Sequence, residues 1–370
     1  AVETEVDGDI TYERYRISMR ESQRVAKSLG KTSQLLKTAA VMRRSALTAL
    51  VSEYEAFMAD LLALAISIRP EVFIDDEARI SLKDIADYSS LEELKEAHIK
   101  QRLEDFLHKS SHKQVLQWIG EKFGVNLLSD TKLVAEFVEV CQRRHLISHA
   151  GSKVNKRYIR ICKESGCRDD QILSLGESVA IDRKYLRRAT ARVYQVGFFT
   201  LHLLWQKLLA DTEGSDRSVL ACSHDFLEND LTKMARRLTH FSLSRKKDRP
   251  HNRTHAYLVI NEAQSHKFDP ELEDEVKAKS VEEALSQRDW SDSSPIVDLV
   301  LACLRNEFED IGSLVDAAAT VGKHKLTYPD VFTYNVFREA RENPAFMGAV
   351  AETFGYVWEL ALARHNEAPA

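Results

Sequence analysis

The chain is poor in the residues that interrupt regular secondary structure. It holds 13 glycines and 7 prolines among its 370 residues, less than half of the roughly 12 % that these two types reach on average. All-β sandwiches, collagen-like chains and low-complexity chains use both residues more heavily, so the composition argues against these classes and favours helices. Hydrophobic residues make up 44 % of the chain, which suits packed cores and is too much for a disordered chain.

Signals for membranes and for secretion are also missing. No apolar run reaches the length of about 18 residues that a membrane span needs, so we expect no span. The first ten residues, AVETEVDGDI, are acidic and lack the apolar centre of a signal peptide. The five cysteines form no C-x-x-C pair, although Cys162 and Cys167 lie close in sequence. We therefore expect reduced cysteines and a cytoplasmic location, with a zinc site as the weaker alternative.

The charge balance excludes a protein that coats nucleic acid through its overall charge. The chain carries 52 Lys and Arg residues against 57 Asp and Glu residues, a net charge of −5. Any contact with nucleic acid therefore needs a local basic patch. Gly-rich phosphate loops of the P-loop or Rossmann type are absent from the sequence. We expect no cofactor and no bound metal.

Apolar residues recur at helical spacing along most of the chain, which predicts an all-α fold. Residues 1–36 are highly charged and predict an extended arm or an outer helix. Residues 37–212 predict a helical bundle. Residues 213–370 predict a C-terminal domain of short α-hairpins, for which degenerate helical repeats are the related alternative. The segment DTEGSD at 211–216 marks the expected boundary.

The predicted bundle contains one irregular excursion. The stretches KVNKRYIRIC and ESVAID have β-like character and predict a small hairpin-like element before the last helix. In the C-terminal half, residues 242–253 form a basic segment rich in breakers. This segment predicts a solvated connector, with a phosphate-contacting loop as the alternative. The helices predicted in the bundle span about 45–62, 90–107, 113–123, 130–149 and 182–209.

The most informative segment is DTKLVAEFVEVCQRRHLISHAGSKVNKRY, residues 130–158. On an ideal helix of about 100° per residue, five apolar residues form one stripe, Arg144 falls near its middle, and His145 and His149 follow its edge. Because burying an unpaired guanidinium is costly, three explanations remain open. Arg144 forms an internal ion pair, or the stripe leaves the core for a cleft or subunit interface, or the helix bends. The stripe consists of Leu133, Val134, Phe137, Val138 and Cys141.

The second explanation gives these residues a chemical role. An arginine in a cleft can bind a phosphate and the charge that develops on it. A histidine with a pKa near neutral can move protons. Arg143 points to the far side of the ideal helix and is expected to be solvated. If Arg144 instead forms a salt bridge with an acidic side chain of its own chain, much of the case for this mechanism fails.

Several other polar or aromatic residues receive a structural interpretation. Glu53 and Glu55 lie among other charges and predict a solvated helix face. His108 and His112 are four residues apart, but a metal there would need further ligands, so no metal site is predicted. The tryptophans are scattered, which favours core positions over a platform for stacking bases. They are Trp118, Trp205, Trp290 and Trp358.

The stretch RRHLISHAGSKVNKRYI resembles the signature of the HEPN superfamily, the higher eukaryotes and prokaryotes nucleotide-binding domains. That signature has an arginine, a polar residue, three further residues and a histidine, which match Arg144, His145 and His149. The segment SEYEAFMADLLALAISIRPEVF also resembles the first helix of such domains. The resemblance covers about residues 37–209. The continuation of the signature is matched by Gly151, Val154, Asn155 and Tyr158.

The resemblance implies a metal-independent endoribonuclease. In that family the 2′-hydroxyl of RNA attacks the adjacent phosphate and leaves a 2′,3′-cyclic phosphate and a 5′-hydroxyl. Arg144 would hold the scissile phosphate, His149 would transfer a proton or orient the hydroxyl, and His145 would assist. Further polar residues of the same segment are expected to contact RNA. These are Arg143, Lys153, Asn155 and Lys156.

The resemblance further implies a homodimer, since relatives pair two such domains and this chain contains one. On an ideal helix Arg144 and His149 lie about 140° apart, so a distorted final turn or a second copy must bring them together. Such nucleases are commonly toxins or defence effectors, and the C-terminal domain is expected to bind a protein partner or inhibitor. The alternative function is a non-catalytic helical scaffold that binds RNA or protein.

Overall fold

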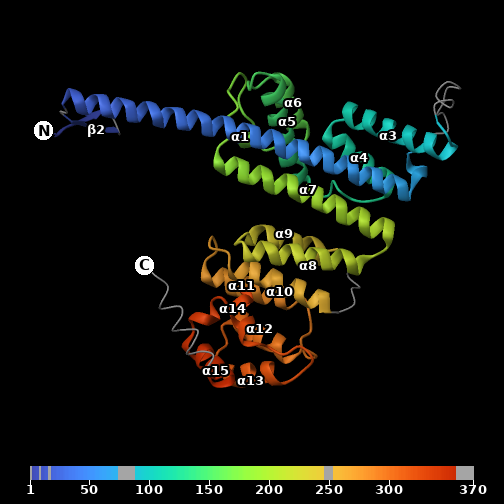
Figure 1. Ribbon diagram of the computed structural model, residues 1–370, viewed down its shortest axis with the longest axis vertical. Helices are drawn as coiled ribbons and strands as arrows, with labels where there is room; N and C mark the ends of the chain where they lie inside the picture. The colour runs from blue at the N-terminus through green and yellow to red at the C-terminus, as the bar shows by residue number, and fades with distance from the viewer. Residues whose placement is uncertain (1, 8–9, 16–17, 74–87, 246–252, 356–370) are drawn as a thin grey trace. The chain divides into compact units, whose positions relative to one another are not determined.

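The structure is a computed structural model that describes residues 2–7, 10–15, 18–73, 88–245 and 253–355. The chain divides into two compact units, residues 1–208 and residues 209–370, where the sequence placed the boundary after residue 212. Helices account for most of the described residues, which confirms the predicted all-α fold (Figure 1). None of the described helices combines the length and apolar character that crossing a membrane requires.

Unit 1 begins with a short antiparallel hairpin that the sequence did not predict. The hairpin pairs β1 (Val2–Asp7) with β2 (Ile10–Tyr15). A helical bundle follows it and contains the candidate site. Its elements are α1 (Met19–Ile68), η1 (Pro70–Val72), α3 (Leu91–Lys109), α4 (His112–Phe123), α5 (Thr131–His149), α6 (Lys156–Glu164), η2 (Asp169–Gln171) and α7 (Arg183–Leu209).

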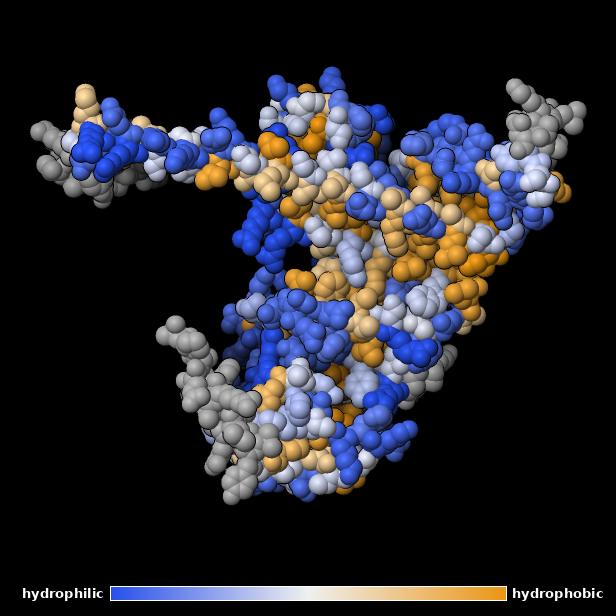
Figure 2. Space-filling view, viewed as in Figure 1, coloured by the Kyte–Doolittle hydropathy of each residue, from blue (hydrophilic) through white to orange (hydrophobic). Residues whose placement is uncertain are grey.

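Helix α1 is one continuous helix across the expected division after residue 36. It starts early because Ser18 and Glu21 form a capping box, in which each side chain accepts a hydrogen bond from the other's backbone N–H. The first half of α1 is exposed to solvent. Its surface is mostly hydrophilic and has some hydrophobic side chains among the polar ones (Figure 2). The second half enters the core. Residues 19–44 therefore form the outer helix that the sequence allowed.

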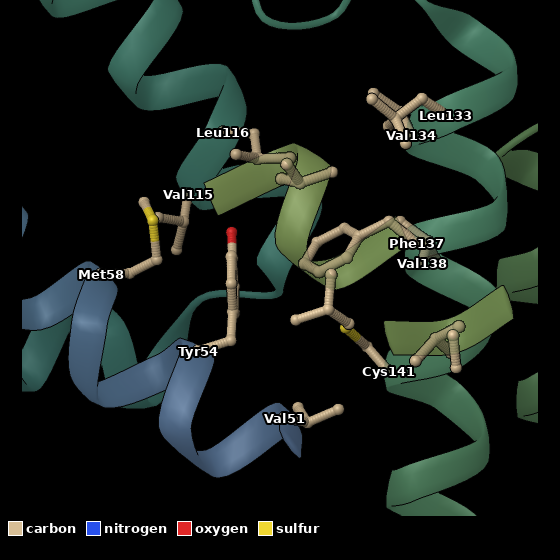
Figure 3. Close-up of a cluster of buried hydrophobic side chains, with 14 of the residues drawn as sticks. Val51, Tyr54, Met58, Val115, Leu116, Leu133, Val134, Phe137, Val138 and Cys141 are labelled. Atoms are coloured by element: carbon tan, nitrogen blue, oxygen red, sulfur yellow. The ribbon is translucent and has the colours of Figure 1, made fainter. Parts of the chain in front are cut away.

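The core of unit 1 lies between α1, α4 and α5. Figure 3 shows Tyr54 of α1 and Phe137 of α5 facing each other, and their ring centroids lie 4.9 Å apart in an edge-on arrangement. Helix α7 packs against the same face of α1, since Gly197 lies beside the rings of Tyr54 and Phe57. This packing holds the first half of α5 against the C-terminal half of α1 and the start of α4.

The prediction of a hairpin-like excursion after α5 is only partly right, because residues 152–154 do pair with residues 176–179 but the rest of the first stretch is helical. Most of KVNKRYIRIC forms helix α6, and Lys153 meets Ser178 at a single antiparallel bridge. The helix begins here because the side chain of Asn155 accepts a hydrogen bond from the backbone N–H of Tyr158 at 2.9 Å. Tyr158 and Cys162 then fall four residues apart on one buried face. Helical spacing of these two residues outweighs the β-propensity of the segment.

Unit 2 is a stack of short helices around a second hydrophobic core. The basic segment at 242–253 is described at its two ends, and its residues 246–252 lie outside the described residues, as does Trp358. The elements are α8 (Thr212–Glu228), α9 (Thr232–Leu243), α10 (Arg253–Lys267), α11 (Asp274–Leu285), α12 (Pro295–Arg305), α13 (Ile311–Thr320), α14 (Tyr328–Thr333), η3 (Asn335–Phe337), η4 (Ala340–Glu342) and α15 (Pro344–Phe354).

Candidate functional site

The residues of the predicted site line one cavity of unit 1, with a volume of about 680 Å³. Arg144, His145 and His149 reach it from the end of α5, and Glu55 and His112 reach it from α1 and α4. Arg144 and His149 therefore meet the same cavity within one chain, without a second copy and without a break in α5. The two side chains lie about 140° apart on an ideal helix, but the cavity is wide enough for both to line it.

The end of α5 is fixed by the chain reversal that follows it. Ala150 is the C-cap, and Gly151 and Ser152 adopt left-handed backbone angles, with φ of 58° and 59°. The backbone N–H of Ser152 donates to the carbonyl oxygen of Leu146 at 3.0 Å. This closure satisfies a terminal carbonyl of the helix and holds His149 at the cavity mouth.

Arg144 forms the internal ion pair that was the first of its three explanations and that removes much of the case for a nuclease, although it also lines a cavity, as the second explanation requires. Its Nη2 lies 3.0 Å from Oε2 of Glu55 and 3.4 Å from Oγ of Ser52, both on α1. The prediction that Glu55 lies on a merely solvated face is therefore wrong. The pair stands at the cavity wall, with 22 % of the Arg144 side chain exposed. Among the described residues, the buried Nε of Arg144 has no hydrogen-bond partner.

Glu55 also binds a second cation, His112. Its Oε1 lies 3.2 Å from Nε2 of His112, so one carboxylate bridges a histidine and an arginine. The hydrogen bond from His112, followed by the charge of Arg144, lowers the pKa of Glu55 although burial opposes this. Attraction to the Cys141 sulfur, and then the hydrogen bonds to Cys141 and Glu55, raise the pKa of His112 to about 10 against the effect of burial.

The raised pKa of His112 bears on the charge at one wall of the cavity, which Glu104, Lys109 and Arg157 also line. A protonated His112, a guanidinium and one carboxylate leave one net positive charge on this trio at neutral pH. The Arg144–Glu55 pair is neutral by itself, and the positive charge of the trio comes from the protonated His112. A positively charged cavity wall with spare N–H donors suits a phosphate group.

The pH dependence of stability tests this assignment. Because the pKa of His112 is higher in the folded protein, its stabilisation is fully present below its unfolded pKa of about 6.5 and is lost as pH rises toward 10. We expect the stability advantage of the wild type over His112→Gln to shrink across this range in urea titrations. A constant advantage from pH 6 to pH 10 would show that His112 is neutral in the folded protein.

The two histidines of α5 form a pair at the other side of Arg144. The rings of His145 and His149 lie 5.0 Å apart between centroids. Burial, followed by the positive charges of Arg157, His149 and Arg144, lowers the pKa of His145. His145 is therefore neutral at neutral pH, whereas His112 is protonated. Environments that push two pKa values apart are typical of an acid and base pair.

The prediction that Arg143 is solvated and contacts RNA is wrong. Its side chain is buried, forms an ion pair with Glu139, and lies over the ring of Tyr185 at 4.0 Å from the centroid. Glu139 also accepts hydrogen bonds from the hydroxyls of Tyr158 and Tyr185, both at 2.8 Å. Burial opposes the charge of Arg143, but Glu139 outweighs this and raises its pKa. The far side of α5 is thus a second packed face, covered by α6 and α7.

The remaining residues predicted to contact RNA have different surroundings. Lys153 and Lys156 are exposed near the end of α5 and are available to a ligand. The side-chain oxygen of Asn155 caps α6, so its position has a structural reason of its own. Arg157, which the sequence analysis did not single out, lines the cavity itself.

Two site residues were missed because their roles depend on tertiary packing. His112 was considered only as half of a metal pair with His108, and Glu55 only as a surface charge. Within the described residues, no cluster of three or more His, Cys, Asp or Glu side chains could hold a metal ion. The available signal was the turn SEYE of α1, in which Ser52 and Glu55 lie beside the core residues of that helix.

Comparison of the chain with protein-family models, with curated proteins and with solved structures finds no match. The assignment of function therefore depends on the chemistry of the cavity.

Proposed function

We propose that this protein is a metal-independent endoribonuclease whose active site is the cavity at the end of α5. The observation that carries the proposal is that one chain lines this cavity with a guanidinium, a neutral imidazole and a protonated imidazole. These are the groups that an attack of the RNA 2′-hydroxyl on its neighbouring phosphate needs. The resemblance of residues 144–158 to the HEPN signature supports the same reaction.

The reaction assigns one role to each group. The neutral His145, assisted by His149, accepts the proton of the 2′-hydroxyl while the 2′-oxygen forms a bond to phosphorus. The bond from phosphorus to the 5′-oxygen breaks, and the protonated His112 gives its proton to that oxygen. Arg144 stabilises the additional negative charge on the phosphate through N–H donors that Glu55 does not use. The products are a 2′,3′-cyclic phosphate and a 5′-hydroxyl.

Exposed cations beside the cavity extend the site along the RNA backbone. Arg157 lines the cavity, Lys153 is exposed on the segment that joins α5 to α6, and Lys156 is exposed at the start of α6. Such residues bind phosphates of flanking nucleotides without reading their sequence. A homodimer remains a prediction from the resemblance, and a role as toxin or defence effector is part of the same proposal.

A binding module without catalysis is the second candidate, and the pairing of Arg144 with Glu55 favours it. Incubation of purified protein with structured RNA in excess EDTA separates the two. The nuclease produces fragments with cyclic-phosphate ends, and the fragments are absent when Arg144→Ala or His149→Ala replaces the wild type. A protein that binds RNA equally well in all three forms, with the RNA intact, is a binding module.

The pH profile of cleavage tests the role of His145. Since its pKa is lowered, cleavage is expected to fall only when the pH drops below about 6.5, where the base becomes protonated. His145→Ala should slow cleavage by about 10²-fold and remove this acidic limb from the profile of kcat/KM. His98→Ala, a change on α3, serves as the matched control. Retention of the acidic limb in His145→Ala would assign the base to another group.

A further inference from the structure

Unit 2 contains two adjoining cavities that no part of the proposed nuclease mechanism uses. Their volumes are about 310 and 580 Å³, within the range of small-molecule sites. The cavities share six lining residues, so they form one site with two lobes. The shared residues are Arg253, Tyr257, Ile296, Val297, Lys323 and His324.

The larger lobe collects positive charge. Arg253 stands at the start of α10, and Lys323 and Lys325 stand on the segment between α13 and α14. Among the residues that the structure describes, none of these three cations pairs with a carboxylate. No carboxylate lines this lobe, and Asp292 lines the smaller one. Cations gathered without counter-charges are the usual environment of an anionic ligand.

Arg253 is held in place by partners that are not carboxylates. Its Nη1 lies 2.9 Å from Nε2 of His324, and its Nη2 donates to the hydroxyl of Tyr257 at 3.3 Å. These contacts orient the guanidinium without cancelling its charge. The first turn of α12, with Ile296 and Val297, also faces both lobes, and the N-terminal end of a helix adds a partial positive charge.

The smaller lobe supplies an aromatic surface. Trp290 is half-buried there, and its Nε1–H donates to the carbonyl oxygen of Leu285 at 2.8 Å, which fixes the ring. The guanidinium of Arg288 lies over this ring, 5.4 Å from its centroid. Trp290 was predicted to be a core residue, and it does pack against the core of unit 2, but it is only half-buried and also lines the smaller lobe. A fixed indole beside a cationic lobe matches a ligand that has a flat ring and a phosphate.

We propose that unit 2 binds a nucleoside phosphate, with the base against Trp290 and the phosphate among Arg253, Lys323 and Lys325. The buried amides of Asn261 and Gln264 form a polar part of the larger lobe. The ligand chemistry can come from a free nucleotide or from the terminal nucleotide of an RNA. The site does not depend on the nuclease activity of unit 1.

Calorimetric titration of the full chain tests this site. The probes are AMP, ATP, GTP, inorganic phosphate and a trinucleotide RNA, and the Arg144→Ala background keeps the RNA intact. We expect a nucleotide or the trinucleotide to bind with a Kd below about 1 mM, and inorganic phosphate to bind at least tenfold more weakly. Binding of mononucleotides identifies a free ligand, and binding of the trinucleotide alone identifies an RNA end.

Variants connect the binding to the cavity. Lys323→Gln and Arg253→Gln should each weaken binding at least tenfold, and Trp290→Leu should weaken nucleotides more than inorganic phosphate. Arg217→Gln, an exposed arginine of α8, is the matched control, and thermal melting checks the fold of each variant. The proposal is overturned if no nucleotide or trinucleotide binds, if inorganic phosphate binds equally well, or if the folded Lys323 and Arg253 variants bind as the wild type does.

Discussion

Replacement of Arg144 with alanine is expected to lower the rate of RNA cleavage by about 10²- to 10³-fold, because the phosphate loses its main source of charge stabilisation. The fold should survive, since the side chain lies at a cavity wall and is partly exposed. Arg144→Lys keeps the charge and loses the planar fork, so it should recover only part of the rate. The measurement is single-turnover cleavage of a labelled RNA in EDTA.

The matched control for this variant is Arg160→Ala. Arg160 is an exposed arginine of the same unit, and its pair with Glu164 is solvated. The Arg160→Ala variant should cleave RNA at the wild-type rate. Equal rates for Arg144→Ala and Arg160→Ala would remove Arg144 from the reaction and leave the Arg144–Glu55 pair as a structural contact.

The second large effect is expected in stability. Arg143→Ala should reduce the free energy of unfolding by about 3–5 kcal/mol, because Glu139 would keep a buried charge without its cationic partner. Urea denaturation measures the change. Arg160→Ala should change stability by less than about 1 kcal/mol, since both partners of that pair are exposed.

The same pair of variants separates the structural role of Arg143 from the RNA contact that the sequence indicated. A loss of stability in Arg143→Ala, with normal RNA binding at temperatures where it stays folded, matches the buried ion pair. A variant of full stability that binds RNA more weakly would instead place Arg143 on the RNA surface.

Local signals in the sequence predicted much of unit 1. The apolar stripe of α5 and the helical spacing over 113–123 predicted helices that the structure contains, and α4 ends at Gly124 in the left-handed conformation. Helical spacing also predicted that Arg144, His145 and His149 lie near one another at the end of this helix, where they line one cavity. These features depend on residues a few positions apart, so one sequence is enough to detect them.

The errors arose where distant segments decide the environment. A helical wheel has one apolar face, but α5 is buried on two, and its second face is closed by the tyrosines of α6 and α7 around Glu139. Arg143 therefore looked solvated. In the same way, Glu55 and His112 gained their roles only when α1 and α4 packed against α5. The proposed site in unit 2 has no local motif, because Arg253 comes from α10 and the two lysines come from the segment between α13 and α14.

The identity of the attacking group tests the central claim most directly. An RNA that the protein cleaves is prepared again with a single 2′-deoxy nucleotide on the 5′ side of the cut, and both substrates are incubated with the protein in excess EDTA. The account predicts that the all-ribose RNA is cut to a 2′,3′-cyclic phosphate and that the substituted bond stays intact, while other bonds are cut as before. Cleavage of the substituted bond at an unchanged rate, or no cleavage of any structured RNA, would contradict it.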